Sequence, residues 1–178
     1  MSKQTAILGG GNFWNLDAVF SEVEGVLAVE AGYAGGWLRD PDREQVCSGQ
    51  TGHAEVVRVT FESSKVRYSQ LLDIFFAIHD PTTVNRQGGD VGPQYRSVIF
   101  ALSPRQRQVA NATIAELEAQ HAFNAPIVTT IENAATFWPA ESHLQHYFAQ
   151  HPSMSYCRFV VQPKLDKFHR RFAALSRS

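Results

Sequence analysis

The sequence predicts an α/β sandwich in which helices pack on one mixed β-sheet. Short runs rich in β-branched residues alternate along the chain with amphipathic stretches of helical period, which is the pattern of that fold class. A chain of 178 residues, 44% of them hydrophobic, is long enough for one domain with a real core and short for two. We therefore expect a single domain over residues 1–178.

The predicted strands are runs of β-branched and aromatic residues. The clearest one, over residues 54–61, contains three valines and a phenylalanine. The full set of predicted strands covers residues 5–8, 26–33, 54–61, 95–102, 126–131 and, at an edge of the sheet, 159–161.

The predicted helices carry apolar residues at helical spacing. They cover residues 13–22, 69–78, 104–120, 141–150 and 164–175. Ser69 and Ser103 are expected as N-caps, with Pro104 at the first position of its helix. Residues 32–47 and 80–94 are rich in turn-forming residues and are predicted to be loops. A long loop inside a compact domain is usually functional or mobile.

Charge and cysteine content narrow the function classes. Sixteen Lys and Arg against 17 Asp and Glu give a net charge of -1, which offers no electrostatic case for binding nucleic acid or an anionic membrane. Neither a membrane span nor a signal peptide is predicted, so we expect a cytoplasmic monomer. Cys47 and Cys157 are expected to be reduced thiols, and their spacing fits no zinc site. No metal or cofactor is expected.

The most informative position is Asn12, which follows a predicted strand and three glycines and begins a predicted helix. Backbone N–H groups and the helix dipole favour a negative charge at such a place, so a cysteine there would be a candidate nucleophile. Asparagine is instead an excellent N-cap. The glycines complete no phosphate-binding motif. Phe13 and Trp14, in the first helical turn, belong either to the core or to the wall of an apolar ligand pocket.

Three further polar residues have two interpretations each. Glu55 enters a strand, so it either faces solvent or lines a pocket, where a carboxyl has a raised pKa and can act as a general acid. Asp90 and Tyr95 lie in a polar cluster that leads from the loop at 80–94 into the next strand. They are either turn and core residues or hydrogen-bonding groups of a pocket.

Together these segments resemble the A-type peptide methionine sulfoxide reductases. That family carries a Gly-Cys-Phe-Trp motif after its first strand, where this chain has Gly11-Asn12-Phe13-Trp14. The resemblance covers nearly the whole chain in order. Further similar segments are residues 32–36, 46–55, 86–97, 136–141, 156–157 and 163–164.

The resemblance implies a ferredoxin-like α/β sandwich and reduction of methionine-S-sulfoxide, free or in peptides. In that chemistry a cysteine thiolate attacks the sulfoxide sulfur and becomes a sulfenic acid, which a second thiol and finally a thioredoxin-type reductant reduce. Carried over, Glu55 would protonate the sulfoxide oxygen, with Tyr95 and Asp90 as polar groups on the oxygen side. Phe13 and Trp14 would hold the substrate's S-methyl group.

The chain departs from the family pattern around this same pocket. Asn12 takes the nucleophile position, and Arg43 takes the position of a second pocket tyrosine. Other departures are Asn15, Ala34, Pro93 and the stretch Ser142-His143-Leu144-Gln145. Cys47 lacks the helix N-terminal setting and is not expected to substitute, and neither is Cys157.

We therefore expect a reductase scaffold that is inactive in the reductase step, because an amide has no redox chemistry. Two alternatives stay open. The pocket could bind a methyl sulfoxide or a methionine-like ligand without reducing it. Otherwise a diverged enzyme could use Glu55 as acid or base, with Arg43 binding an anionic substrate group.

Overall fold

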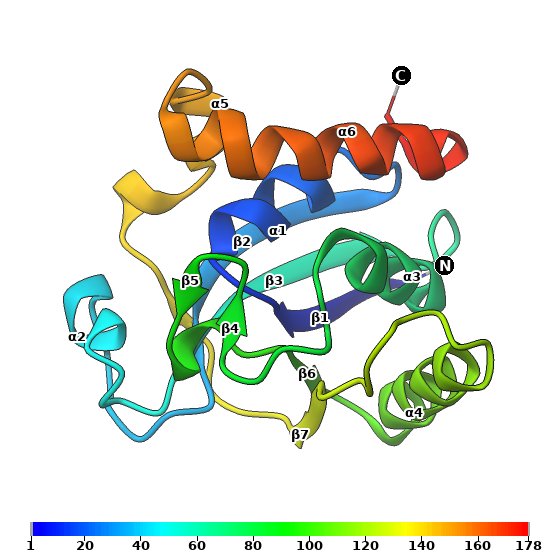
Figure 1. Cartoon of the computed structure of the whole chain (residues 1–178), viewed down its shortest axis with the longest axis horizontal. Coiled ribbons are helices and arrows are strands. Elements are labelled where there is room, and N and C mark those ends of the chain that lie inside the picture. The colour runs from blue at the N-terminus through cyan, green and yellow to red at the C-terminus, as the bar shows by residue number, and fades with distance from the viewer. Residues whose placement is uncertain (1, 178) are drawn as a thin grey trace.

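The computed structural model describes residues 2–177 and contains a six-stranded sheet with helices packed on it (Figure 1). The strand order is β7-β6-β1-β3-β2-β8, and all neighbouring strands are antiparallel except β6 and β7. The strands are β1 (Lys3–Gly9), β2 (Val26–Ala34), β3 (Ala54–Glu62), β6 (Val98–Ala101), β7 (Thr130–Asn133) and β8 (Trp138–Pro139).

Most of the helices connect these strands. They are α1 (Phe13–Phe20), α2 (Arg43–Cys47), α3 (Tyr68–Ile78), α4 (Pro104–Ala119), α5 (Tyr147–Gln150) and α6 (Gln162–Arg171). A small separate hairpin pairs β4 (Arg86–Gln87) with β5 (Asp90–Val91). Short 3₁₀ turns are η1 (Pro93–Tyr95), η2 (Ser142–Leu144) and η4 (Ala173–Leu175), and η3 (Cys157–Val161) is a π-helical turn.

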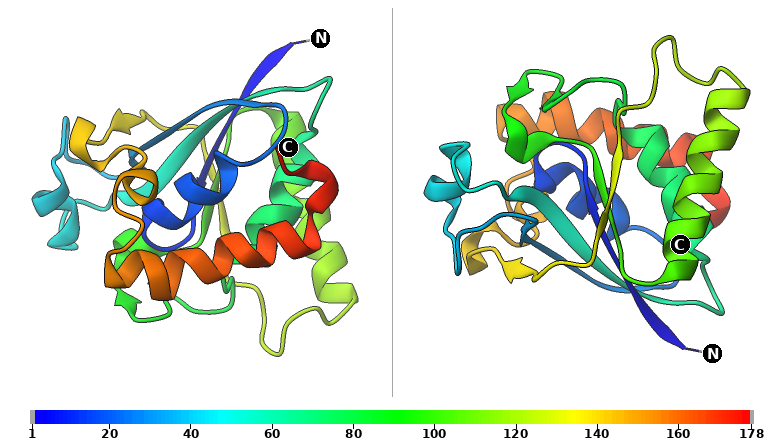
Figure 2. Two further views of the ribbon diagram at one scale, coloured as in Figure 1. Left: turned by 90° about the horizontal axis from the view of Figure 1, so that it is seen from above. Right: turned by 90° about the horizontal axis from the view of Figure 1, so that it is seen from below.

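The central part of the chain has ferredoxin-like topology. In chain order β1, α1, β2, β3, α3 and β6 form a βαββαβ unit, and its strands lie in the order β6-β1-β3-β2. Helix α1 packs on β2 and β3, and α6 lies across α1 and α3 on the same side of the sheet (Figure 2). The predicted fold class, an α/β sandwich with a ferredoxin-like core and a mixed sheet, is confirmed.

The core fills the space between the sheet and these helices. Its aromatic side chains come from every layer, and full burial of each contributes about 1.5–3 kcal/mol. The largest fully buried side chains include Phe13, Phe20, Phe61, Phe75 and Phe168. Because Phe13 belongs to this core, the start of α1 is fixed against the sheet.

Two helix predictions were wrong in their details. The predicted loop 32–47 contains α2, because Asp42 caps it: the Gln45 N–H donates to Asp42 Oδ1 at 2.8 Å, within a capping box. Ser69 is not an N-cap. Helix α3 begins one residue earlier, and the N–H of Arg67 donates to the Gln70 side chain at 2.9 Å.

The C-terminal third differs most from the prediction. The predicted edge strand 159–161 lies within the π-helical turn η3, where Cys157 and Val161, four residues apart, are both fully buried. A short apolar run does not distinguish strand from helix by its period. The predicted helix 141–150 is interrupted at Gln145, whose side chain bonds the N–H and C=O of Ala31 in β2, both at 2.8 Å.

The predicted loop 80–94 contains the β4–β5 hairpin and begins η1, and the short strand β8 was not predicted. The other differences are shifts of boundaries. The strand predicted at 95–102 begins at Val98, and the strand predicted at 126–131 begins at Thr130. The last helix covers Gln162–Arg171 rather than 164–175. Ser103 and Pro104 begin α4 as predicted, with Ser103 Oγ accepting from the Gln106 N–H at 3.1 Å. Over residues 2–177, none of the helices combines the length and apolar character needed to cross a bilayer.

Candidate functional site

The site is built around the turn from β1 into α1. Gly11 has φ +87°, and a Cβ at that position would lie 2.8 Å from the Gln87 side chain, so the turn and its close contact with β4 require glycine. Asn12 follows as the N-cap of α1 and is 4% exposed. Its Oδ1 accepts the Trp14 N–H at 2.9 Å, which satisfies one of the free donors at the helix end.

Glu55 lies directly beneath this helix end. The Phe13 N–H donates to Glu55 Oε1 at 3.0 Å, and the side chain is completely buried. Among the described residues, Glu55 Oε2 has no hydrogen-bond partner. Of the two interpretations of Glu55, a solvent-facing position is therefore wrong.

The buried environment changes the acidity of Glu55. Burial raises its pKa from 4.5 to about 7, although the Phe13 N–H and the charge of Arg43 act in the opposite direction. The negative charge of Asp90 raises it further. Near neutral pH this carboxyl is therefore divided between its protonated and ionised forms, as a general acid requires.

Aromatic rings form one wall of the site. The Trp14 ring stacks on Tyr147 with centroids 4.0 Å apart and meets the edge of Tyr156 at 5.9 Å. Phe13 packs against Tyr33 at 5.7 Å inside the core. Thus Phe13 is a core residue, whereas Trp14 is half-buried and borders the site.

A chain of hydrogen bonds joins α1 to the β4–β5 hairpin. The Tyr156 hydroxyl donates to Asp90 Oδ2 at 2.7 Å and accepts from Asn15 Nδ2 at 2.9 Å. The same Asn15 amide also donates to the backbone oxygen of Asn12 at 3.0 Å. Sequence reasoning missed Tyr156 and Tyr147. The segment 156–157 was part of the family resemblance, but nothing in its spacing indicated a contact with residue 90.

Tyr95 approaches from the other side, on η1. Its backbone oxygen accepts the Gly11 N–H at 3.1 Å, which ties η1 to the turn before α1. Burial and the negative charge of Glu55 raise the pKa of the Tyr95 hydroxyl well above its ordinary value. The hydroxyl therefore stays protonated and can donate a hydrogen bond.

Arg43 reaches the same cluster from α2. Its backbone N–H donates to Glu141 Oε2 at 3.1 Å, and the Tyr33 hydroxyl donates to the other carboxylate oxygen of Glu141 at 3.1 Å. The guanidinium carbon lies 4.6 Å from the centroid of the Trp14 ring and 5.9 Å from that of Phe13. At these distances a guanidinium is attracted to an aromatic face. The structure thus gathers all seven predicted site residues, namely Asn12, Phe13, Trp14, Arg43, Glu55, Asp90 and Tyr95.

Cys47, at the end of α2, also belongs to this neighbourhood. Cys47 is exposed, but partial desolvation raises the pKa of its thiol and the charge of Glu55 raises it further, whereas Arg43 and Tyr95 lower it. The net effect disfavours a thiolate at neutral pH. Cys157 is buried in η3, and burial raises the pKa of its thiol as well. Within residues 2–177, no group of three or more His, Cys, Asp or Glu side chains could hold a metal ion.

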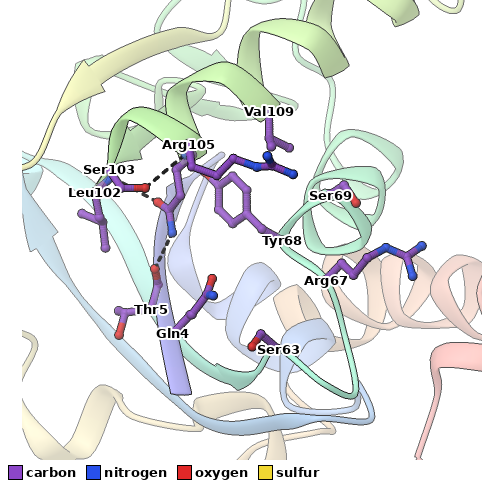
Figure 3. Close-up of a pocket in the computed structure, with 11 residues that line it drawn as sticks. Gln4, Thr5, Ser63, Arg67, Tyr68, Ser69, Leu102, Ser103, Arg105 and Val109 are labelled. Atoms are coloured by element: carbon purple, nitrogen blue, oxygen red, sulfur yellow. Dashed lines mark hydrogen bonds between the residues drawn. The ribbon is translucent and has the colours of Figure 1, made fainter. Parts of the chain in front are cut away.

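A separate hollow of about 620 Å³ lies elsewhere, between β1, α3 and α4 (Figure 3). Tyr68 and Arg67 border it from the α3 side, and Arg105 and Val109 from α4. The Gln106 side chain bonds the backbone oxygen of Thr5 at 2.8 Å across its base. The described residues that line this hollow include none of the predicted site residues.

Fold and site together define a ferredoxin-like protein with a cluster of acidic and aromatic side chains at a helix N-terminus. The chain belongs to the family described as peptide methionine sulfoxide reductase, whose model matches residues 4–176. It is 55% identical over 174 residues to peptide methionine sulfoxide reductase MsrA of Ralstonia nicotianae, covering 96% of this chain and 91% of that protein. It is 52% identical over 172 residues to MsrA of Chromobacterium violaceum, covering 97% and 98%.

Solved structures agree with this assignment. Reduced Mxr1 of Saccharomyces cerevisiae matches with a TM-score of 0.78 and 30% identity, over 87% of this chain and 89% of that one. Methionine sulfoxide reductase A of Corynebacterium diphtheriae matches with a TM-score of 0.74 and 30% identity, over 84% and 76%. The family resemblance seen in the sequence is therefore confirmed.

Proposed function

We propose that this protein keeps the substrate-facing groups of a methionine sulfoxide reductase but cannot carry out the reductase step. The observation that carries the proposal is Asn12 at the buried N-terminus of α1, where the resemblance places the nucleophilic cysteine. Reduction of a methyl sulfoxide by this chemistry needs a thiolate that attacks the sulfoxide sulfur and is itself oxidised to a sulfenic acid, while the reduced thioether leaves. A carboxamide cannot form that bond, and the oxygen of Asn12 already accepts the Trp14 N–H.

The remaining thiols do not replace it. Cys47 is exposed at the C-terminal end of α2, where the helix dipole opposes a thiolate, and partial desolvation of the thiol raises its pKa. Cys157 is fully buried in η3. Mxr1 has been solved in complex with Trx2. Since Asn12 contains no sulfur that could be oxidised, we infer that a thioredoxin-type reductant has no sulfenic acid or disulfide to reduce at this position.

A second candidate function is binding without reduction. It is favoured by the free oxygen of Glu55, which is buried and aimed at no partner among the described residues. A methyl sulfoxide or methionine-like ligand with an acceptor oxygen would accept a hydrogen bond from this group in its protonated form. The diverged-enzyme alternative, with Glu55 as acid or base, uses the same carboxyl.

The test is turnover of a peptide containing methionine-S-sulfoxide with excess dithiothreitol, followed by chromatography of the methionine product. The unmodified protein is expected to give no product. Sustained methionine formation would overturn the proposal, and Cys47→Ser and Cys157→Ser variants would then identify the thiol responsible. The Asn12→Cys variant reports on the pocket: weak activity that Glu55→Gln abolishes would show that the acid is still placed to protonate a sulfoxide.

A further inference from the structure

The guanidinium of Arg43 has one nitrogen, Nη1, that no hydrogen-bond acceptor among the described residues satisfies. Its Nη1 is inaccessible to solvent and has no acceptor among the described residues, and no ion pair within residues 2–177 includes it. Glu141 accepts the backbone N–H of Arg43 rather than its guanidinium. A buried, unpaired donor of a cation costs more than an ordinary missing hydrogen bond, so a group that accepts from it would stabilise the site.

Glu55 offers a second unpartnered atom in the same cluster. Its Oε2 is buried and free of hydrogen bonds within residues 2–177, while its Oε1 is held by the Phe13 N–H. The two groups lie close enough for the positive charge of Arg43 to act on the Glu55 carboxyl and on the Tyr95 hydroxyl. Arg43 as a whole is half-buried, so part of this side chain lies at the surface, although Nη1 itself does not.

The position of the guanidinium decides which ligand would fit. It covers the face of Trp14 at 4.6 Å, and the family resemblance implies that this ring would hold the S-methyl group of a neutral methyl sulfoxide. A neutral sulfoxide also brings a single acceptor oxygen and no charge. A small oxyanion brings two acceptor oxygens and a negative charge, and guanidinium binds such groups in a bidentate, charge-assisted manner.

We propose that Arg43 is the specificity-determining residue of this site and that, together with Glu55, it makes a binding site for a small organic oxyanion of the carboxylate or sulfinate class. This inference rests on the proposed loss of the reductase step at the same site. One oxygen of the anion accepts from Arg43 Nη1, and the other accepts the proton on Glu55 Oε2.

Binding at this site is coupled to a proton. The groups that face Glu55 are Arg43 and Cys47 from α2, Asp90 from β5, Tyr33 from β2, Tyr95 from η1 and Tyr156 before η3. Of these, only Arg43 is a cation, and an ionised Glu55 would compete with the ligand for it. The anion therefore binds the form in which Glu55 is protonated, and its affinity falls as the pH rises above about 7.

The test uses two probes of nearly equal shape, methanesulfinate and dimethyl sulfoxide. Methanesulfinate has an anionic oxygen where dimethyl sulfoxide has its second methyl group. Binding to the unmodified protein is followed by titration calorimetry and by tryptophan fluorescence at pH 6 and pH 8.5. Methanesulfinate is expected to bind roughly tenfold or more tightly than dimethyl sulfoxide at pH 6, as a charge-assisted hydrogen bond requires. Near pH 7.5 the protein should take up a proton when methanesulfinate binds. The measured heat of binding should therefore depend on the ionisation enthalpy of the buffer.

Three variants separate the contributions. Arg43→Gln should abolish the preference for the anion, while the exposed control Arg105→Gln on α4 should keep it. Glu55→Gln keeps a hydrogen-bond donor without a titrating proton, so it should bind methanesulfinate equally at both pH values. Circular dichroism confirms that each variant is folded.

Equal or tighter binding of dimethyl sulfoxide, or unchanged methanesulfinate binding in Arg43→Gln, would overturn this inference. Turnover of a methionine sulfoxide peptide by the unmodified protein would overturn the proposed function instead. The two failures are therefore distinguishable.

Discussion

Replacing Glu55 by glutamine should remove most of the pH dependence that this side chain gives to stability. The carboxyl is completely buried, and its pKa rises from 4.5 to about 7 in the folded protein. The folded state therefore holds its proton more tightly than the unfolded state does. The stabilisation is fully present below pH 4.5 and is lost as the pH rises to about 7.

The size of the effect follows from the two pKa values. They differ by roughly 2.5, and at about 1.4 kcal/mol for each pH unit the loss is about 3 kcal/mol of unfolding free energy. Glutamine keeps the shape and the acceptor for the Phe13 N–H but has no proton to lose.

Urea unfolding at pH 4.5 and pH 8 gives the measurement, with the variant as the reference at each pH. At each pH the unfolding free energy of the unmodified protein is compared with that of Glu55→Gln. This difference should shift by about 3 kcal/mol against the unmodified protein between pH 4.5 and pH 8. Other titrating groups contribute equally to both proteins and cancel. If the difference between the two proteins is the same at both pH values, Glu55 is not held in a buried, charge-disfavouring site and the reasoning fails.

Three further outcomes are expected. Burial lowers the pKa of His79 to about 4, so neutral His79 stabilises the folded state above pH 6.5 and this stabilisation is lost as the pH falls to about 4. The unfolding free energy of the unmodified protein should therefore fall by about 3 kcal/mol between pH 7 and pH 4 on account of His79. Urea unfolding of His79→Gln should lack this loss. Asn12→Ala removes the N-cap and should lower the unfolding free energy by about 1 kcal/mol in urea, whereas Asn12→Asp should keep the cap. Tyr156→Phe breaks the link to Asp90 and should cost about 1–3 kcal/mol. Hydrogen exchange should show faster opening of the β4–β5 hairpin in Tyr156→Phe, and unchanged protection there would contradict the assigned link.

Local chemistry predicted the beginning of the site well. Asn12 was expected either as an N-cap or at a nucleophile position, and its capping bond to Trp14 is present. For Glu55 the sequence left two predictions open, a surface position and a pocket position, because the period of a strand alone does not say which face is buried. The structure decides this through the antiparallel pairing that places Glu55 opposite Tyr33 and under the start of α1.

Contacts between distant segments could not be predicted in the same way. Tyr156 reaches Asp90 across 66 positions, and Glu141 holds Arg43 across 98. The sequence contains both partners of each pair but no signal for their proximity, since it depends on how η3 and the loop after β8 return to the sheet. The same reason explains the error at 159–161, where burial of Cys157 and Val161 on one side of a helical turn outweighs β-branched composition.

The two asparagines of the first helical turn are connected to each other. Asn15 donates to the backbone of Asn12 and to Tyr156, which in turn holds Asp90, so the amide at position 15 organises the groups around position 12. Arg43 independently covers Trp14 from the opposite segment. Several neighbours of position 12 therefore form one connected set of contacts. Asn12→Cys should accordingly recover less reductase activity than Asn12→Cys combined with Arg43→Tyr, and equal activity in the two variants would show that Arg43 does not close the pocket.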